Sequence, residues 1–563
     1  MTNGPQPGSA LKSKLFFNEL FNKWPIYATL SALYVSALIL FVEPIYPTND
    51  NFGILLAAKD GFLVEFVGVA FSVYLHVLYK YVSLNVPWYA LTLYTAHVVG
   101  IALFLFTVSK IPASKIVKTL YAFVYLLCYS LFVYCVDYNS ASIMIGANAL
   151  LAFLVSAKGN NSRLKALLLG IAFSLSFLFR VYGMFGVLAF TAPFIVLYLY
   201  QYKIKGRLLL TFLLPFLLFV GVDFLFKGPL ASPGYKQYRP YVELQGKLLG
   251  YNKERYVDPV ILASNQWTFN DFMLFLEFMY VDEHKYSREK LQNLLDYVDR
   301  AEKMDTRRSA FDLNQLRQFI STYAPFLMLL GGLFFLALYG SNWRTVIMAS
   351  AFILYGVCVA LFLEIYYRFP IRIGVPLLLM YSTFLFSSIL LYRAYGSAGK
   401  NFLKKISLIL FIFLILSGGY LQTIVGSRYY SDLRRLGARI ERIYATLNSK
   451  YNGSVILLSP TRYYFKGIAG NALNNNFDKF RTVDLGWLIF SPRFYAQLNE
   501  IGTKAGYELF PAFVDKPNYY VLAGENGEQL ILNYLRENGY PAVEAMPVEL
   551  FNGFLVLYKL VSK

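Results

Sequence analysis

The chain contains twelve apolar runs, each close to the length of a membrane-spanning helix. A helix needs about 20 mostly apolar residues to cross the hydrocarbon core of a bilayer. The runs lie near residues 25–44, 66–84, 88–108, 116–136, 140–157, 164–182, 184–202, 207–226, 320–340, 345–366, 371–393 and 406–424. Only 15% of the residues are charged, against roughly a quarter in soluble domains. We therefore expect a polytopic α-helical membrane protein.

The positive charges between these runs decide how many of them cross. Cytoplasmic connectors carry an excess of Lys and Arg. We interpret the basic N-terminus as the cytoplasmic lead-in to a retained anchor. Three basic connectors then need to lie on the same side of the membrane: 110–118, 158–165 and 203–207. If both 66–84 and 88–108 crossed the membrane, all three basic connectors would lie outside. We expect 66–84, which follows Glu65 and carries His76 and Lys80, to be a helix in the outer interface; an ordinary short span is the alternative.

With the 66–84 helix interfacial, about eleven spans remain, as do two soluble regions. The predicted parts are an N-terminal transmembrane module (1–226) with its first external loop at 45–87, a partly helical extracytoplasmic loop (227–319), further transmembrane helices (320–426) and an extracytoplasmic tail (427–563). In the tail, strand-like SVILLSP and NYYVLAG alternate with a helical GEQLILNYLRENGY, which predicts a small α/β domain. The tail has no Gly-rich phosphate loop and no nucleophile elbow, so we expect no independent active site there.

Composition excludes several classes of function. The formal net charge of +19 comes largely from Lys and Arg in the short connectors, so it indicates membrane topology and argues against nucleic-acid binding. The three Cys lie within apolar runs and form neither a disulfide framework nor a zinc motif. The three His are too scattered for a metal cluster. No cofactor is predicted with certainty, and a divalent metal ion is left open.

Ionisable residues gather at the predicted outer ends of the helices. Charges at membrane depth are costly and mark functional sites. The ionisable residues at these helix ends are Asp50, Asp60, Glu65, Asp137, Arg180, Asp223, Glu364, Arg368 and Arg372. A carboxylate such as Asp50 can serve as a general base toward a hydroxyl, and the guanidinium of arginine suits phosphate. The set fits a site where a lipid-borne phosphate leaves and a hydroxyl or amine attacks.

Each of these residues also has a plainer interpretation. Asp50 could be a solvated end of the first span, and Arg180 could extend to the interface as lipid-facing arginines do. Arg368 and Arg372 flank a proline and could be interfacial anchors. The convergence of acids and arginines on one face, next to an interfacial helix, favours the functional interpretation.

Two stretches resemble the GT-C superfamily of membrane glycosyltransferases, which use polyprenyl-phosphate-linked sugars. Asp50 in PTNDNF stands where that superfamily has an acidic residue early in its first external loop, although Asn49 replaces the second acid often found there. The order of DGFLVEFVGVAFSVYLHVLYKYVSLNVPWYALTLY is similar to that of lipid A aminoarabinose transferases and protein O-mannosyltransferases, with Glu65 at the acidic position. Phe66 and Val67 stand where those enzymes have prolines.

The second stretch is YYRFPIRIGVPLLLMYSTFLF, in which Arg368 matches the arginine of the family pattern best and Arg372 is an extra. The chain also resembles a set of bacterial polytopic proteins with a loop stretch like QWTFNDFMLFLEFMYVDEHKYSREKL, which contains Asp271. The resemblance covers residues 20 to 425 as architecture and does not cover the tail.

The resemblance implies an inverting glycosyltransferase in the plasma (inner) membrane of a prokaryote. It implies a polyprenyl-phosphate or polyprenyl-pyrophosphate sugar donor, a glycan, lipid or protein acceptor in the cell envelope, and Asp50 as the catalytic residue. The expected substrate-binding residues are Asp60, Glu65, Arg180, Arg368, Arg372 and Asp271. Two alternatives remain: an O-antigen ligase or polymerase that relies on Arg239 or Arg255 in the large loop, and a transporter or flippase with twelve spans.

Overall fold

The computed structural model describes most of the chain. The described ranges are 8–157, 162–249, 253–304, 313–339, 343–366, 369–393, 401–458, 471–473, 481–483, 485–524, 526–551 and 555–563. Arg368, one of the expected site residues, lies outside them.

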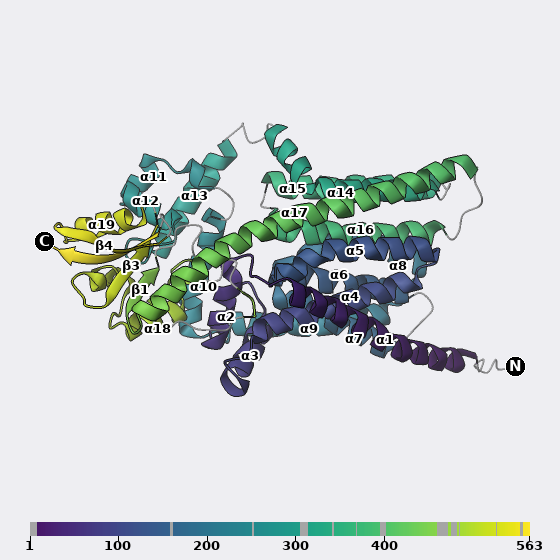
Figure 1. Ribbon diagram of the computed structural model, residues 1–563, viewed down its shortest axis with the longest axis horizontal. Coiled ribbons are helices and arrows are strands. Elements are labelled where there is room, and N and C mark those ends of the chain that lie inside the picture. Colours follow the sequence, from purple (N-terminus) through teal and green to yellow (C-terminus); the bar gives the residue numbers. More distant parts are fainter. Residues whose placement is uncertain are drawn as a thin grey trace.

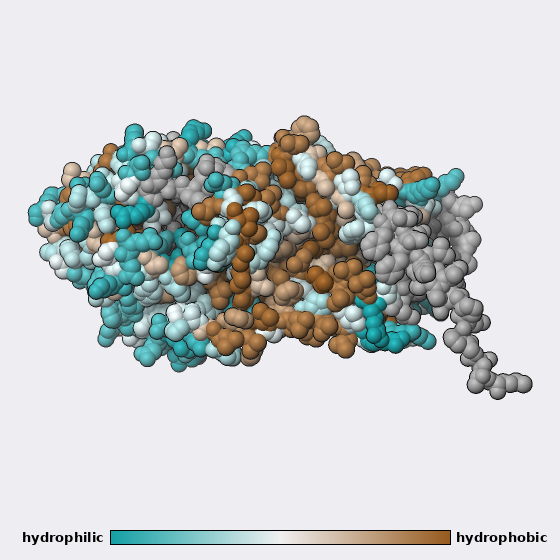
Figure 2. All heavy atoms as spheres, turned by 90° about the horizontal axis from the view of Figure 1, so that it is seen from below, coloured by the Kyte–Doolittle hydropathy of each residue, from teal (hydrophilic) through white to brown (hydrophobic). Residues whose placement is uncertain are grey.

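The molecule consists of a long helical bundle with a smaller mixed domain at one end (Figure 1). The bundle helices are α1 (Gly8–Phe41), α4 (Trp88–Lys110), α5 (Lys115–Tyr134), α6 (Tyr138–Ser156), α7 (Arg163–Phe179), α8 (Val181–Tyr202), α9 (Gly206–Lys227), α14 (Leu313–Tyr339), α15 (Trp343–Tyr366), α16 (Ile371–Arg393) and α17 (Asn401–Lys450). Apolar residues gather over the bundle and hydrophilic ones cover the domain end (Figure 2). This is the pattern of a multi-pass membrane protein.

Among the described residues, ten helices are long and apolar enough to cross a membrane. The eleven expected spans differ from these ten by α7, which ends at Phe179 after 17 residues because Arg180 leaves the helix with an extended backbone. Helix α7 packs between α6 and α9. Its Gly170 lies so close to the backbone of Phe212 that a side chain there would collide with the Phe212 carbonyl oxygen.

Helices α6 and α16 form the centre of the bundle. In their most apolar stretches, 89% of the residues of α6 and 94% of those of α16 are buried. Small residues allow the close packing of α6: a Cβ atom at Gly146 would lie 2.5 Å from the hydroxyl of Ser176 in α7. Polar contacts add to this packing, since Ser142 in α6 donates a hydrogen bond to the carbonyl oxygen of Ser176 at 2.7 Å. These two central helices carry the residues of the candidate site at their ends.

The segment after α1 is made of short helices. It contains α2 (Asn49–Lys59), α3 (Val69–Val77) and η1 (Leu78–Val82), one turn of π-helix. Helix α3 and η1 together hold 14 residues, at most about 21 Å, which is short of the roughly 30 Å hydrocarbon core. This length agrees with the predicted interfacial helix in the first loop.

The domain is built on a five-stranded mixed sheet of order β2-β1-β3-β5-β4. Its strands are β1 (Val455–Leu458), β2 (Arg481–Val483), β3 (Tyr519–Ala523), β4 (Val543–Phe551) and β5 (Leu555–Ser562). Strand β1 runs parallel to β2 and β3, whereas β5 runs antiparallel to β3 and β4. The helices of the tail are α18 (Pro492–Glu500), α19 (Gly527–Glu537), η4 (Gly506–Glu508) and η5 (Pro511–Phe513). The predicted α/β tail is confirmed.

The large loop between α9 and α14 packs against this sheet domain. Its elements are α10 (Pro233–Leu249), η2 (Lys253–Tyr256), α11 (Pro259–Ser264), α12 (Phe269–Leu276) and α13 (Arg288–Met304). Loop residues such as Leu274 and Leu291 share one hydrophobic core with Val455, Phe494 and Leu535 of the tail. Loop and tail therefore form a continuous structure at one end of the bundle.

Helix α17 links the bundle to this domain without a break. It holds 50 residues, about 75 Å at 1.5 Å per residue, and runs from the far end of the bundle to the sheet (Figure 1). Within the bundle it packs mainly on α14 and α5. The short helices α2 and α10 lie between the bundle and the sheet, and α3 lies at the lower edge of the molecule (Figure 1).

Candidate active site at the domain end of the bundle

Asp50 lies at the start of α2, where the bundle meets the domain. An acidic residue in the first turn of a helix is favoured by the helix dipole. Its Oδ2 atom lies 3.3 Å from Nη1 of Arg372, in the first turn of α16, and accepts a hydrogen bond from the Tyr138 hydroxyl at 3.4 Å. The Asp50 and Arg372 side chains are 22% and 24% exposed. The ion pair is thus accessible, and it joins positions 322 residues apart.

A second carboxylate, Asp137, lies beside this pair. It is only 1% exposed, and its Oδ1 atom accepts hydrogen bonds from the side-chain amides of Asn51 (3.1 Å) and Asn139 (3.3 Å). The carbonyl oxygen of the Asn51 side chain accepts a bond from the Tyr89 hydroxyl at 2.8 Å. The Oδ2 atom of Asp137 has no hydrogen-bond partner within the described ranges. Asp137 therefore retains the capacity to accept a proton or a donor group.

Asp137 and Arg372 line the same small pocket, of about 20 Å³. Other residues around it include Cys135 from the end of α5, Ser140 of α6 and Tyr429 of α17. The pocket is thus bounded by the ends of α5, α6 and α16, by the middle of α17 and by the start of the first loop. In the sequence, Asp137 is one of the charges at the helix ends but is not among the expected site residues. The signal was present in its position directly before α6.

Arg180 is the second cation of the site. It stands between α7 and α8 in an extended conformation, and its guanidinium lies over three aromatic rings, 5.0 Å from the centroid of Phe66 and 5.4 Å from those of Tyr138 and Tyr182. Its Nε is buried and has no hydrogen-bond partner in the part of the chain that the structure describes. A buried donor without a partner is costly, so this atom is a candidate for binding a ligand.

Tyr138 connects the two halves of the site. Its hydroxyl reaches Asp50, and its ring lies beneath Arg180 and 5.8 Å from Phe66. The site therefore combines one accessible carboxylate in an ion pair, one buried carboxylate and one guanidinium held by aromatic rings. Such a set can take a proton from an acceptor and bind an anion close by.

Asp60 and Glu65 lie further along the first loop, and both are engaged by the domain. Asp60 forms an ion pair with Arg493 of α18. Glu65 accepts a hydrogen bond from the Tyr235 hydroxyl and lies 3.5 Å from Nε of Arg239 in α10. Burial and the nearby Glu65 carboxylate raise the pKa of Tyr235. These contacts give both acids a role in holding the loop.

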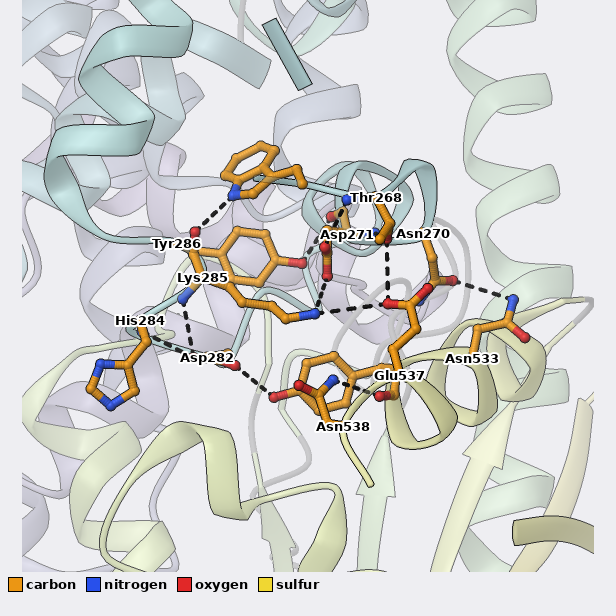
Figure 3. Close-up of polar contacts among 12 residues, drawn as sticks. Thr268, Asn270, Asp271, Asp282, His284, Lys285, Tyr286, Asn533, Glu537 and Asn538 are labelled. Atoms are coloured by element: carbon orange, nitrogen blue, oxygen red, sulfur yellow. Dashed lines mark hydrogen bonds and ion pairs between the residues drawn. The ribbon is translucent and has the colours of Figure 1, made fainter. Parts of the chain in front are cut away.

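Asp271 lies in the domain, in the loop-to-tail network of Figure 3. It is 1% exposed, forms a capping box with Thr268 at the start of α12, and pairs with Lys285 at 2.8 Å. Lys285 also lies 3.8 Å from Glu537 of α19. In this network the Asp271 carboxylate already has its partners, and no contact joins it to Asp50 or Arg180 within the described chain.

Within the described ranges, no three His, Cys, Asp or Glu side chains gather as a metal site would require. His76 points its Nδ1 at the carbonyl oxygen of Ala58 at 3.0 Å, and His97 contacts the Tyr129 hydroxyl at 2.9 Å. The positive charge paired with Asp50 is the guanidinium of Arg372.

The sequence matches no protein-family model and no curated protein. Among solved structures, the chain is similar to crystal structures of ArnT from Cupriavidus metallidurans, one bound to undecaprenyl phosphate and one in the apo state. The identity is 11% and the TM-score 0.40 in both cases, with 95% of this chain and 97% and 98% of those chains covered.

Proposed function

We propose that this protein is a membrane glycosyltransferase that moves a sugar from a polyprenyl-phosphate-linked donor to an acceptor hydroxyl or amine. One observation carries the proposal: at the end of a membrane bundle, Tyr138 contacts both Asp50, which is paired with Arg372, and Arg180, whose buried Nε has no partner in the described chain. A proton acceptor and an anion-binding group side by side are what such a transfer needs.

In this proposal Arg180 binds the phosphate of the donor. Its guanidinium offers several N–H donors in a plane, which suits phosphate oxygens. The aromatic rings of Phe66, Tyr138 and Tyr182 hold that plane in place. The negative charge that develops on the phosphate as it leaves is then stabilised by a guanidinium already oriented toward it.

Asp50 acts on the acceptor. Its carboxylate takes the proton of the acceptor hydroxyl or amine while the acceptor oxygen or nitrogen forms a bond to C1 of the sugar. The bond between C1 and the phosphate oxygen breaks, and its electron pair stays on the polyprenyl phosphate. Attack opposite the leaving phosphate inverts the configuration at C1. Arg372 and Tyr138 hold the carboxylate in position for this step.

The polyprenyl chain reaches the site from the bilayer, in this proposal past α3 and η1. This segment exposes large apolar side chains, among them Tyr74, Tyr81 and Val82, as expected of a helix in the interface. It is tied to the bundle next to the site, since Gly68 N–H donates to the Leu178 carbonyl oxygen at 2.8 Å and Val69 N–H to Asp223 at 2.8 Å.

The domain end is proposed to face the outside of a prokaryotic plasma membrane. The basic connectors at 110–118 and 203–207 lie at the opposite end of the bundle, since they join the ends of α4 to α5 and of α8 to α9 that point away from the domain (Figure 1). By the positive-inside rule that opposite end is cytoplasmic. A glycan, lipid or protein of the cell envelope would then be the acceptor.

The two alternatives make different demands on the structure. The transporter hypothesis requires 66–84 to cross the membrane, whereas the helix there is too short. The ligase hypothesis needs arginines of the large loop, but Arg239 is paired with Glu65 and Glu243, and Arg255 packs on Tyr256.

The test is the release of free polyprenyl phosphate by purified protein in vesicles. A panel of polyprenyl-phosphate sugars, with total cell-envelope extract as acceptor, is incubated with wild-type protein and with Asp50→Asn. We expect release by the wild type and a loss of about 10²-fold or more in the variant, the contribution of a general base. If Asp50→Asn releases the product at the wild-type rate, the proposed mechanism fails.

A further inference from the structure

The tail places an aromatic side chain against the helix that carries Asp50. Trp487 lies in a turn of the tail just before α18, and its ring meets that of Phe66 edge-on with the centroids 4.8 Å apart. It also covers α2 one turn after Asp50: a Cβ atom at Gly53 would lie 2.6 Å from the Trp487 ring. Trp487 therefore contacts both α2 and the aromatic residue that lies under Arg180.

The backbone of this turn is held from the large loop. The carbonyl oxygen of Trp487 accepts a hydrogen bond from the Tyr238 hydroxyl at 2.9 Å. The N–H of Gly486 donates to the carbonyl oxygen of Phe278 at 3.2 Å, and Gly486 has a φ of +98°, a conformation that a residue with a side chain rarely adopts. The indole of Trp487 is thus presented from a fixed turn.

A second contact holds the other end of α2. Arg493 of α18 is 8% exposed, forms an ion pair with Asp60, and donates to the carbonyl oxygen of Leu56 at 3.3 Å. Burial lowers the pKa of Arg493 to about 10, so it remains protonated at neutral pH. If α2 moved away, the buried charge of Arg493 would lose Asp60 as its partner, which is costly. The ion pair between Arg493 and Asp60 therefore holds α2 against the tail.

A third contact lies before α2. Asn471 donates from its side chain to Glu43 at 2.7 Å, and the N–H of Ala472 donates to the carbonyl oxygen of Pro44 at 2.8 Å. The Tyr46 hydroxyl in turn donates to the carbonyl oxygen of Ala472 at 3.2 Å. The tail consequently contacts the chain before, within and after α2, the helix of Asp50.

We propose that the tail is part of the active site, with Trp487 as the positioning residue that sets α2 and Phe66 and, through them, Asp50 and Arg180. This inference rests on the proposed function and extends it. Trp487 acts through α2 and Phe66 rather than on a reacting group; it determines where α2 lies relative to the bundle ends that carry Arg372 and Arg180. A displacement of about 1 Å at a catalytic group costs on the order of 10²-fold in rate.

The experiment compares Trp487→Ala, Gly53→Ala, the double variant and the control Trp343→Ala, whose side chain is 67% exposed on α15. Gly53→Ala leaves the tail intact but adds a methyl group where the indole of Trp487 lies. We therefore expect the new methyl group to push α2 away from the indole. Hydrogen exchange of residues 49–59 reports on α2, and kcat and the KM for the donor report on the site.

We expect faster exchange in α2 for both single variants, with unchanged exchange in α4, α6 and the sheet. Both should lower kcat by roughly 10²-fold and raise the donor KM, because Phe66 no longer holds Arg180 in place. In the double variant the smaller residue at position 487 makes room for the methyl group added at position 53, so this variant should be no worse than Trp487→Ala alone. A purely structural role would lower the amount of active protein and leave the KM unchanged.

Three results would overturn the inference: wild-type exchange of α2 in both single variants, an unchanged donor KM, or additive losses in the double variant. If Trp487→Ala does not fold, Gly53→Ala alone carries the test, since its tail is unaltered. Should the wild type release no polyprenyl phosphate from any donor, the proposed function fails, whereas the exchange of α2 still decides whether Trp487 holds this helix.

Discussion

At the scale of single residues, the site is a set of side chains that are distant in sequence and meet around Tyr138. Asp50 and Arg372 balance each other's charge, whereas Arg180 lies over the faces of aromatic rings. A cation over an aromatic face gains a modest attraction, about 0.5–2 kcal/mol, and leaves the N–H groups of the guanidinium free to bind an anion as well. An anion that enters next to Phe66 therefore meets a guanidinium ready to bind it.

The first prediction concerns Arg180. Arg180→Lys keeps the charge but loses the planar fork of donors and its stacking on Phe66 and Tyr138. Loss of a hydrogen bond to a charged group costs about 1.5–3 kcal/mol, so we expect kcat/KM for the donor to fall about 10- to 100-fold. The KM rises because the donor phosphate is bound less tightly, and kcat falls because the charge on the leaving phosphate is stabilised less. Steady-state kinetics at varied donor concentration measure both. A fall in kcat alone would contradict binding of the donor by Arg180.

The second prediction concerns metal ions. The Arg372 guanidinium is already placed against the Asp50 carboxylate, and a divalent cation brought next to it would be repelled. We expect transfer to persist in excess chelator and to fall on Arg372→Ala even in the presence of Mg²⁺ or Mn²⁺. The measurement is release of polyprenyl phosphate with and without chelator. Loss of activity in chelator, restored by added metal, would contradict the prediction.

The third prediction separates a structural acid from a catalytic one. Asp271→Ala leaves Lys285 without its buried partner and removes the capping box of α12. Breaking a buried pair of this kind costs about 3–5 kcal/mol, so the unfolding temperature of the domain should fall. Thermal unfolding in detergent measures this, with the exposed Asp296→Ala as control. A normal unfolding temperature together with lost transfer would instead indicate that Asp271 binds substrate.

At the scale of elements, length and hydrophobic pattern made much of the fold predictable from the sequence. All the apolar runs except 66–84 form bundle helices, and the strand-like stretches around 455 and 519 form β1 and β3. Strand β4 was missed because its run VEAMPVELF contains Pro547 and two acids, and it pairs only as an edge strand next to β5. Edge strands tolerate proline and charge.

The site was predictable in part. The sequence pointed to Asp50, Arg180 and Arg372 because charges at membrane depth stand out. It did not indicate that Asp60 and Glu65 are held by Arg493 and Tyr235, because those partners lie in the tail and in the large loop. Trp487 carried no signal at all, since its role depends on contact with Gly53 and Phe66 across more than four hundred positions.

The predicted interfacial placement of α3 and η1 gives the fourth prediction. A cysteine at Asn85, an exposed position directly after η1, should react with a membrane-impermeant reagent added from outside. A cysteine at Lys115, in the connector at the opposite end, should react only after the membrane is opened. Cys358, the exposed native thiol, is first replaced by Ala. Protection at 85 together with labelling at 115 would reverse the assignment of sides.

At the scale of the whole molecule, the bundle and the domain are joined by direct contacts, and the candidate site lies where they meet. The loop and the tail share a hydrophobic core, and the tail contacts the first loop at three places. The candidate site therefore has a wall formed by both parts.

The fifth prediction tests the orientation of the molecule. A cysteine at Lys516, an exposed position before β3, should be labelled from outside in intact cells, as at 85. The reason is that the basic connectors at the opposite end stay in the cytoplasm. A tail labelled only in opened cells would place the domain and the site in the cytoplasm and would remove the cell-envelope acceptor.

The unbroken course of α17 has a consequence for how this architecture can vary. The helix is packed on α14 and α5 at one end and leads directly into β1 at the other, so its length sets both the height and the angular phase of the domain. One inserted residue would turn the domain by about 100° around the helix axis and raise it by about 1.5 Å, which would swing Trp487 away from Gly53. Two full turns, about seven residues, would restore the angle but lift the domain by roughly 10 Å. The number of residues between membrane and sheet is therefore as much a part of the site as Asp50 itself.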